Sequence, residues 1–324
     1  MKVLVTGGAG YIGSHFVKLL SEKNYHVVVI DNLSRGHREA VSKNIHFEDI
    51  DLLDAGSLSY FIQTQMPSAV VHFAALAYVG ESVKHPERYY QNNVVGSFNL
   101  IKLCAENGVK NFVFSSTCSI YGNPSKIPIS EDQPSQPINP YANTKLMIET
   151  LLKDFETALG IKHVTLRYFN AAGADPSGLI GESHNPEPHL IPIVLETAQS
   201  KRKKVFVYGN DYDTSDGTCI RDYIHVNDLA DAHLKSLEYL INGGESNVIN
   251  LGTGKGNSVL EIIEKAKAIT KKEIPFEVVS RRVGDPAILV ADNKKAKDLL
   301  GWSPMYSIER ILETAWKWHS NQKY

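Results

Sequence analysis

The sequence predicts an α/β fold with a doubly wound parallel sheet, followed by a smaller C-terminal α/β lobe. Short apolar runs alternate with amphipathic stretches through the first half of the chain, an order typical of right-handed strand–helix–strand units. The clearest of these runs lie at 3–5, 27–30, 69–73 and 112–114. A glycine-rich turn directly after the first run also favours a parallel sheet that binds a ligand at the carboxyl ends of its strands.

The domain organisation follows from chain length and from two proline-rich loops. With 324 residues, the chain is long enough for one large unit and a smaller lobe. The loops at 124–140 and 176–192 interrupt the strand–helix alternation, and long loops in a compact fold usually carry function. We therefore expect a cofactor domain at 1–175 and a substrate domain at 176–324, with some segments of the latter crossing back to the first domain.

Composition excludes several classes of partner. The net charge of −2 gives no reason to expect nucleic acid or an anionic membrane as a partner, and no apolar run reaches membrane-spanning length. Cys104, Cys118 and Cys219 are far apart and form no C-x-x-C pair, which argues against disulfides and against a zinc site. The prediction is a cytoplasmic protein.

The turn at 7–13 reads GGAGYIG and contains both G-x-G-x-x-G and G-x-x-G-x-x-G. Glycines let the backbone approach a pyrophosphate, which a following helix N-terminus binds through its N–H groups and dipole. Asp31 ends the second apolar run, where a carboxylate accepts hydrogen bonds from the ribose hydroxyls and repels a 2′-phosphate. Arg35 leaves NADP open, but the pattern favours NAD and a Rossmann-type sheet.

A candidate proton relay follows in the sequence. Tyr141 and Lys145 are four residues apart at the start of a helix expected after Pro140, so they share one face. A nearby ammonium and a positive nicotinamide ring would lower the pKa of the phenol and favour its use as an acid and base. Thr117 follows an apolar strand and offers a hydroxyl; its alternative role is to cap the turn.

These features, in this order, resemble the extended short-chain dehydrogenase/reductase superfamily. Further segments narrow the resemblance to the UDP-glucose 4-epimerases, over essentially the whole chain. They are His72–Ala75, Val79–Ser82, Tyr89–Val94, Leu166–Asn170, Tyr208–Tyr212, Asp216–Val226 and Arg281–Asp285.

The resemblance implies roles for individual residues. Tyr141, Lys145 and Thr117 would be catalytic, with Tyr141 exchanging a proton with the sugar 4-hydroxyl while a 4-keto intermediate forms and turns. NAD would be held by Gly7, Gly10, Tyr11, Ile12, Gly13, Asp31, Asn32, Asp51, Leu52, Phe73, Ala74, Ala75, Asn92, Ser115, Tyr141, Lys145 and Tyr168. The UDP-sugar would be held by Thr117, Tyr141, Asn170, Leu190, Tyr208, Arg221, Arg282 and Asp285. A homodimer through helices near Tyr89 and Met147 is also implied.

The substrate residues have a physical interpretation. Two arginines from separate segments, Arg221 and Arg282, can hold a diphosphate by charge-assisted hydrogen bonds, and Tyr208 can flank uracil. The alternative is that the arginines form ion pairs with Asp222 or Asp285.

Three positions depart from the family pattern, and alternatives remain. Thr117 stands where serine is common and His189 where asparagine is common. Leu289 is of intermediate bulk near a wall that governs N-acetylated sugars, so UDP-GlcNAc and UDP-GalNAc stay open. Cys118 and Ser119 stand where 4,6-dehydratases carry an acidic pair, which disfavours that reaction.

Two alternative functions remain, one with a different substrate and one without catalysis. A UDP-glucuronate epimerase or decarboxylase, and a non-enzymatic dinucleotide-sensing regulator, remain as alternatives. No metal is expected, because the chain has no H-E-x-x-H and no third ligand is evident beside His184 and His189.

Overall fold

The computed structural model describes residues 1–282 and 284–324, so Val283 of the 281–285 motif lies outside the described residues. The chain divides into two compact units. The first comprises Met1–Gly122, Ser135–Tyr168 and Ala230–Ile249, and the second comprises Asn123–Pro134, Phe169–Leu229 and Asn250–Tyr324. The chain thus crosses between units more often than a single boundary at 175 describes.

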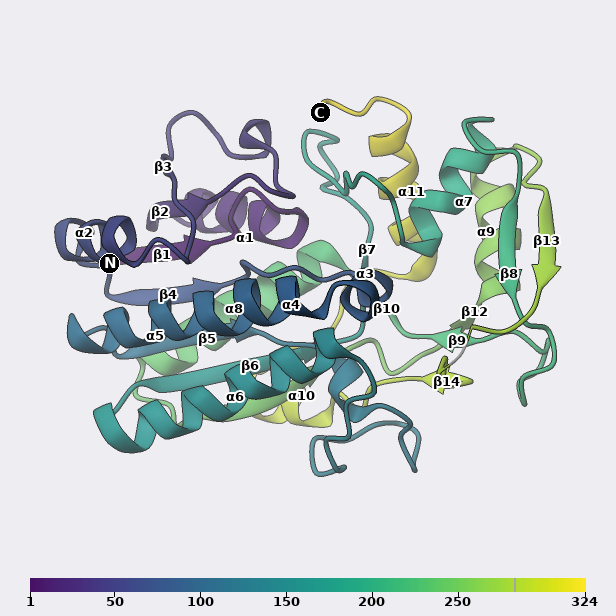
Figure 1. Ribbon diagram of the computed structural model, residues 1–324. Coiled ribbons are helices and arrows are strands. Elements are labelled where there is room, and N and C mark those ends of the chain that lie inside the picture. The colour runs from purple at the N-terminus through teal and green to yellow at the C-terminus, as the bar shows by residue number, and fades with distance from the viewer. Residues whose placement is uncertain (283) are drawn as a thin grey trace. The chain divides into compact units, whose positions relative to one another are not determined.

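The first unit is built on a seven-stranded sheet (Figure 1). Its strands are β1 (Lys2–Thr6), β2 (His26–Asp31), β3 (His46–Asp49), β4 (Ala69–His72), β5 (Asn111–Ser115), β6 (Lys162–Tyr168) and β11 (Asn247–Leu251). The order is β11-β6-β5-β4-β1-β2-β3, and every ladder from β3 to β6 is parallel. The predicted doubly wound α/β fold is confirmed.

Continuous apolar runs form these strands because both faces of the sheet are covered. Val3, Leu4 and Val5 of β1 are completely buried, as parallel strands between helices require. The strand order reverses between β1 and β4. Doubly wound sheets bind their ligands in the crevice at the carboxyl ends of such a pair of strands.

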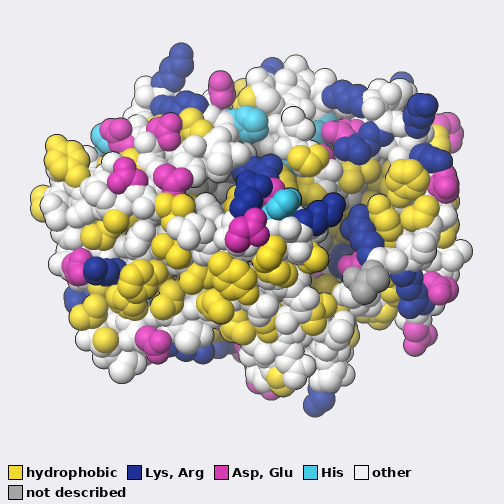
Figure 2. Space-filling view, in the orientation of Figure 1, with side chains coloured by type: hydrophobic (Ala, Val, Ile, Leu, Met, Phe, Trp, Pro, Cys, Tyr) yellow, Lys and Arg dark blue, Asp and Glu magenta, His cyan; other side chains and the backbone are white. Residues whose placement is uncertain are grey.

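Helices cover both faces of this sheet. They are α1 (Tyr11–Glu22), α2 (Ala55–Gln65), α3 (Val79–Lys84), α4 (Pro86–Tyr89), the π-helix η2 (Tyr90–Val95), α5 (Gly96–Glu106), α6 (Pro140–Leu159) and α8 (Val226–Ile241), with short 3₁₀ turns η1 (Arg38–Ala40) and η3 (Cys118–Tyr121). In Figure 1, α5 and α6 lie in front of the strands and α8 behind them. Figure 2 shows apolar side chains gathered over α4 and α5 on the front face.

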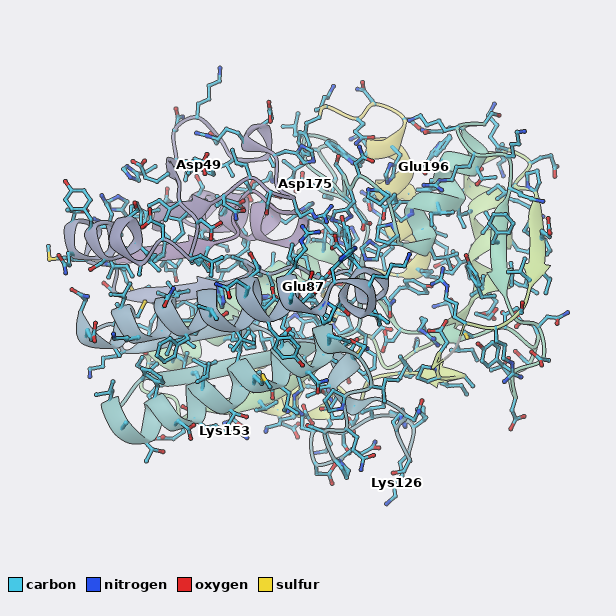
Figure 3. The ribbon with its side chains drawn as sticks, viewed as in Figure 1. Asp49, Glu87, Lys126, Lys153, Asp175 and Glu196 are labelled. Atoms are coloured by element: carbon cyan, nitrogen blue, oxygen red, sulfur yellow. The ribbon has the colours of Figure 1, made fainter. Side chains whose placement is uncertain are left out.

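Helix α6 has clear start and stop signals. The side chain of Asn139 accepts a hydrogen bond from the N–H of Ala142, and Pro140 occupies the first turn. The helix ends at Gly160, whose φ of +70° is left-handed. Within it, Glu149 is buried, whereas Lys153, one turn later, is exposed on the outer side (Figure 3).

The second unit is an α/β lobe with short strands. Its strands are β7 (Asn170–Ala172), β8 (Val205–Tyr208), β9 (Ile220–Arg221), β10 (Tyr223–His225), β12 (Asn257–Ser258), β13 (Phe276–Val279) and β14 (Ile288–Leu289), and its helices are α7 (Leu190–Ala198), α9 (Val259–Thr270), α10 (Lys294–Leu300) and α11 (Ile308–His319). The strands pair as β10-β7, β12-β9-β14 and β13-β8. An apolar core joins α7, α9 and α11.

Within residues 1–282 and 284–324, no helix has the length and apolar character needed to cross a bilayer.

Candidate functional site

The turn between β1 and α1 requires glycine at two positions. Gly7 has a φ of +70°, and a Cβ there would lie 2.5 Å from the backbone nitrogen of Ala74. A Cβ on Gly13 would lie 2.1 Å from the carbonyl oxygen of Gly7. The glycines therefore allow β1, α1 and the chain after β4 to approach closely at the switch point of the sheet.

A pocket opens beside this turn, within the first unit. Ten of the predicted NAD-binding residues line it: Gly7, Gly10, Asp31, Asn32, Asp51, Leu52, Phe73, Ala74, Ala75 and Asn92. These residues come from segments spread over more than eighty positions of the sequence. The glycine cradle and the carboxylates fit a dinucleotide, because the backbone can contact the pyrophosphate while the acidic side chains accept hydrogen bonds from ribose.

Asp31 is held in place by the backbone around it. Its carboxylate accepts hydrogen bonds from the N–H groups of Ala9, at 3.0 Å, and Leu33, at 2.9 Å. Burial raises the pKa of Asp31, and these hydrogen bonds partly oppose the increase. Beside it, the amide of Asn32 donates to Asp51 at 3.0 Å.

Arg35 lines the same pocket, but its guanidinium is already engaged by neighbouring side chains. Its guanidinium forms an ion pair with Glu81 at 2.8 Å and lies 4.8 Å from the centre of the Tyr78 ring. A cation already engaged in this way gives less attraction to a 2′-phosphate, which Asp31 would repel. The geometry therefore favours NAD, as the sequence predicted.

The three predicted catalytic residues converge at the carboxyl end of β5. Tyr141, at the start of α6, is buried and makes a hydrogen bond with Thr117. The ammonium of Lys145 donates to the carbonyl oxygen of Ser115 at 2.8 Å and lies 6.0 Å from the centre of the Tyr141 ring. Thr117 also caps η3 by accepting from the N–H of Ser119, so the two roles weighed for it coexist.

The electrostatics of the relay differ from the expectation. Burial raises the pKa of Tyr141, and the hydrogen bond with Thr117 opposes this only in part. Burial also lowers the pKa of Lys145 to about 7, against the attraction of Glu149. The ammonium together with a positive nicotinamide ring was expected to lower the pKa of the phenol; in the chain by itself, desolvation is the larger effect.

Seven predicted NAD residues lie outside the pocket lining. Tyr141 and Lys145 belong to the relay, and the hydroxyls of Ser115 and Tyr168 are 2.5 Å apart next to it. Tyr11, Ile12 and Gly13 form the first turn of α1, with Tyr11 as its first residue.

The predicted UDP residues all lie in the second unit, apart from Thr117 and Tyr141. Arg221 donates to the carbonyl oxygens of Ile220 and Pro286, both at 2.9 Å, and its other nitrogen lies 3.9 Å from the carboxylate of Asp285. The guanidinium of Arg282 covers the ring of Tyr208 at 3.8 Å. The alternative that Arg221 forms an ion pair with Asp285 is therefore confirmed, although the distance between the charged atoms is long for an ion pair.

Asp222, the other suggested partner of Arg221, has a different role. It is completely buried and accepts hydrogen bonds from Thr253, Gly254 and Ala291. Its own carbonyl accepts from the N–H of Asn170, which places Asn170 beside the Arg221 strand. Leu190 begins α7 and packs against the core of the second unit.

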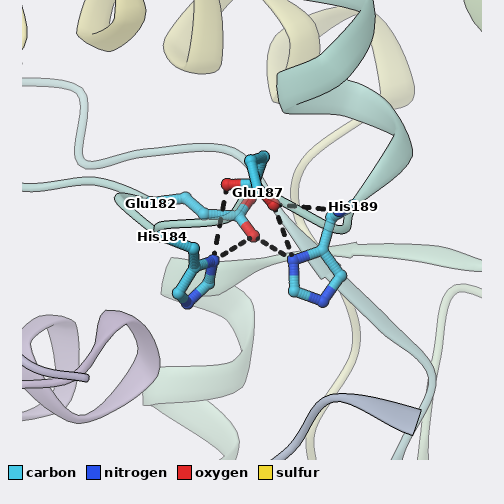
Figure 4. A group of neighbouring side chains, drawn as sticks. All are labelled: Glu182, His184, Glu187 and His189. Carbon is cyan, nitrogen blue, oxygen red and sulfur yellow. Dashed lines mark hydrogen bonds and ion pairs between the residues drawn. The ribbon is translucent and has the colours of Figure 1, made fainter. Parts of the chain in front are cut away.

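His184 and His189 do have further candidate ligands beside them, contrary to the prediction. Glu182 and Glu187 lie next to both imidazoles, and one atom from each of the four residues falls within 4.8 Å of the others (Figure 4). Burial alone would lower the pKa of both histidines. The interactions with the two carboxylates instead raise the pKa of His184 to about 9 and that of His189 to about 10.

Sequence reasoning missed several residues of the site. Gly36 lines the pocket, and a Cβ on it would lie 2.8 Å from the carbonyl carbon of Ala9, so the turn after β2 also needs a small residue. The carboxylate of Glu149 interacts electrostatically with Lys145. Glu149 could have been identified from the sequence, because Tyr141, Lys145 and Glu149 are four residues apart and lie on one face of the helix. The lining is completed by Ile30, Ser34, Arg35, Ile50 and Leu76.

The fold and pocket define a dinucleotide-binding α/β protein with a buried tyrosine–lysine pair. Residues 3–252 match the NAD dependent epimerase/dehydratase family. A UDP-glucose 4-epimerase from Halalkalibacterium halodurans is 51% identical in an alignment of 325 positions that covers 100% of this chain and 97% of that protein. The chain belongs to the NAD-dependent epimerase/dehydratase family.

Solved structures of related proteins support the same family assignment. The UDP-glucose 4-epimerase from Brucella ovis in complex with NAD is 47% identical with a TM-score of 0.95, covering 97% of each chain. The enzyme from Bifidobacterium longum in complex with NAD⁺ and UDP is 38% identical with a TM-score of 0.94, covering 99% of each chain. The resemblance to UDP-glucose 4-epimerases is confirmed over the full chain.

Proposed function

We propose that the protein is an NAD-dependent UDP-glucose 4-epimerase, an isomerase that interconverts UDP-galactose and UDP-glucose through a transient 4-keto sugar. The observation that carries this proposal is the arrangement of Tyr141, Thr117 and Lys145 at the end of β5, in the unit that contains the glycine-lined pocket. The full-length similarity to UDP-glucose 4-epimerases supports it.

Each residue of the relay has a distinct task. The phenol of Tyr141 exchanges a proton with the 4-hydroxyl of the sugar, and the Thr117 hydroxyl shares that hydrogen bond. Lys145, anchored on the Ser115 carbonyl, orients the relay and supplies positive charge when protonated. Bound NAD supplies the redox chemistry, since its nicotinamide accepts a hydride from C4 of the sugar and returns it.

The substrate is a UDP-sugar, and the second unit offers groups for its UDP part. Arg221 and Arg282 provide two guanidinium groups for a diphosphate, and Tyr208 provides an aromatic ring for the base. One terminal nitrogen of Arg221 is fixed by the carbonyl oxygens of Ile220 and Pro286, whereas the other has only the long 3.9 Å contact with Asp285, which leaves that nitrogen available to a phosphate.

A homodimer and a cytoplasmic location complete the proposal. Val83, Val95, Phe98 and Met147 are exposed apolar side chains on α3, η2, α5 and α6, which pack against one another in the first unit. A second copy that covers this surface would remove it from water. All three cysteines lie in the described part of the chain and carry thiols, which suits a reducing compartment.

The test is turnover of UDP-galactose by the purified protein with no added cofactor. UDP-glucose should form while total hexose stays constant. Tyr141→Phe should reduce the rate roughly 100- to 10,000-fold, since general acid–base catalysis contributes this much. The matched control is Tyr60→Phe, which removes a phenol that is 72% exposed on α2 and should leave the rate unchanged.

Two results would contradict the proposal. If UDP-galactose stays unchanged even with NAD added, the substrate assignment is wrong. If Tyr141→Phe keeps near-normal turnover, Tyr141 is not the proton carrier.

A further inference from the structure

The loop that leads into α7 contains two Glu-x-His pairs that fold against each other. Glu182 and His184 form the first pair, and Glu187 and His189 form the second. The four side chains meet in front of the N-terminus of α7 (Figure 4). All four belong to the second unit, and none has a role in the epimerisation described above.

Ligand-atom spacing in this cluster suits a metal ion. The Nδ1 atom of His184 lies 3.3 Å from Glu182 and 3.5 Å from Glu187, and that of His189 lies 2.7 Å from Glu182 and 3.1 Å from Glu187. In a tetrahedral zinc site with bonds of about 2.0–2.1 Å, neighbouring ligand atoms are about 3.3 Å apart. With Oε1 of Glu182 and Oε2 of Glu187 as the two oxygen ligands, the distances of 2.7, 3.3 and 3.5 Å to the imidazole nitrogens lie on either side of the spacing that such a site requires.

The contacts of the two imidazole rings also favour a metal ion. Each Nδ1 faces an oxygen of both carboxylates at once, within 3.5 Å. A single N–H donates well to only one acceptor, because hydrogen bonds weaken steeply away from linearity. A shared cation between the carboxylates, in contrast, would be bound by one nitrogen of each ring.

The negative charge of the two glutamates in the cluster must be balanced. The side chain of Glu182 is 4% exposed, and so is that of Glu187. Two carboxylates this deeply buried are stable only when opposite charge is close. Both glutamates form ion pairs with these histidines, and the buried His319 also interacts with both carboxylates, so their charge is balanced either by protons on imidazoles or by one divalent cation.

We propose that Glu182, His184, Glu187 and His189 bind one divalent transition-metal ion of the zinc type. Two imidazole nitrogens with two carboxylate oxygens favour Zn²⁺ or Co²⁺ over the oxygen-preferring Mg²⁺ and Ca²⁺. Four ligands from the chain make a closed site, which is typical of structural rather than catalytic zinc. Because His189 directly precedes Leu190, the ion ties the loop to the start of α7.

The experiment uses the full chain after treatment with a chelator and dialysis. Titration with Zn²⁺ in a calorimeter should give one ion per chain, and Mg²⁺ or Ca²⁺ should neither bind nor compete. Co²⁺ should produce the visible absorption of a four-coordinate ion. Zn²⁺ should also raise the melting temperature of the chain, because binding to the folded state alone stabilises it.

Variants identify the ligands. His184→Gln and His189→Asn should each weaken Zn²⁺ binding more than tenfold and abolish the thermal shift. His189 is 46% exposed, so its replacement can be made without refilling a core. His85→Gln is the matched control, since it removes an exposed His–Glu pair with a distance of 3.7 Å and should leave Zn²⁺ binding unchanged.

Opposite results would overturn the proposal. If stripped wild-type protein binds no Zn²⁺ at micromolar concentration, the two histidines balance the charge as protonated imidazoles. If both variants bind Zn²⁺ as tightly as wild type, the ion is held elsewhere. Neither result depends on epimerase activity, so a failure here is distinct from a failure of the proposed function.

Discussion

At the scale of single residues, the protonation of Lys145 governs the relay. With a pKa near 7, roughly half of its side chains carry charge at neutral pH when no cofactor is bound. Tyr141 meanwhile keeps its proton, because burial raises its pKa. The chain by itself therefore holds the relay in a largely neutral state, and a phenolate needs further positive charge close by.

Asp31 gives a prediction about pH. Since burial raises the pKa of its carboxyl, protonation begins at a higher pH than for an exposed aspartate, and a protonated carboxyl accepts ribose hydroxyls poorly. NAD affinity of the stripped protein should therefore fall as the pH decreases from 7 to 5, measured by calorimetry. Asp31→Asn should bind roughly ten times more weakly at pH 7, with little pH dependence, since a hydrogen bond to a charged group contributes about 1.5–3 kcal/mol. Equal pH profiles for the two proteins would contradict this role.

Leu289 gives a prediction about specificity. In β14 it pairs in register with Arg221 of β9, so it lies beside a proposed UDP-binding residue. Leu289→Tyr should reduce turnover of N-acetylated UDP-sugars more than that of plain UDP-hexoses, because the larger ring occupies space that the acetamido group needs. The measurement is kcat/KM for UDP-GlcNAc and UDP-glucose. The variant Ile288→Val, at the neighbouring position, serves as the control, and an unchanged ratio in Leu289→Tyr would show that Leu289 does not form the wall.

At the scale of elements, α6 connects the relay to the core of the first unit. One turn after Lys145, the carboxylate of Glu149 accepts from both Ser116, at 2.5 Å, and Arg167, at 3.0 and 2.5 Å. Arg167 also donates to the hydroxyl of Tyr121 at 2.9 Å. This buried network joins α6 to β6 and to the segment after β5, and it orients the helix face that carries Tyr141.

Removing one charge from this network should be costly. Glu149→Gln leaves the Arg167 guanidinium buried without its counterion, and breaking a buried pair in this way typically costs about 3–5 kcal/mol. Chemical denaturation should show a loss of this size. Lys153→Gln, on the exposed side of the same helix (Figure 3), should change the free energy of unfolding by less than about 0.5 kcal/mol. Similar losses for both variants would show that the network adds nothing specific.

At the scale of the whole molecule, the exposed apolar surface of the first unit predicts self-association. Phe98 of α5 is 40% exposed and lies against Phe155 of α6, with ring centres 6.1 Å apart. Phe98→Glu should shift the protein from dimer to monomer in light scattering, because a carboxylate in an apolar interface loses its hydration. Met305→Glu, at an 85% exposed position of the second unit, should leave the mass unchanged. A wild-type protein that is monomeric at all concentrations would contradict the dimer.

Much of the fold could be predicted from the sequence, and so could most of the residues that line the pocket beside the glycine turn. Buried parallel strands are apolar along their whole length, so the runs at β1, β2, β4 and β5 were visible without coordinates. The glycine turn, Asp31 and the Tyr141–Lys145 spacing are local patterns of the same kind. Short-range periodicity reports such features directly, because the backbone geometry of a strand, a turn or a helix repeats over a few residues.

The tertiary structure alone decided which residues meet across long stretches of chain, and how deeply each is buried. Arg35 was a possible phosphate ligand until Glu81 and Tyr78 were found beside it, and Arg221 has Asp285 rather than Asp222 as its carboxylate neighbour. Burial raises the pKa of Tyr141 in the chain by itself, and the folding of one loop sets two glutamates beside His184 and His189. Contacts and desolvation of this kind depend on the packing of the whole chain, which residue spacing does not encode.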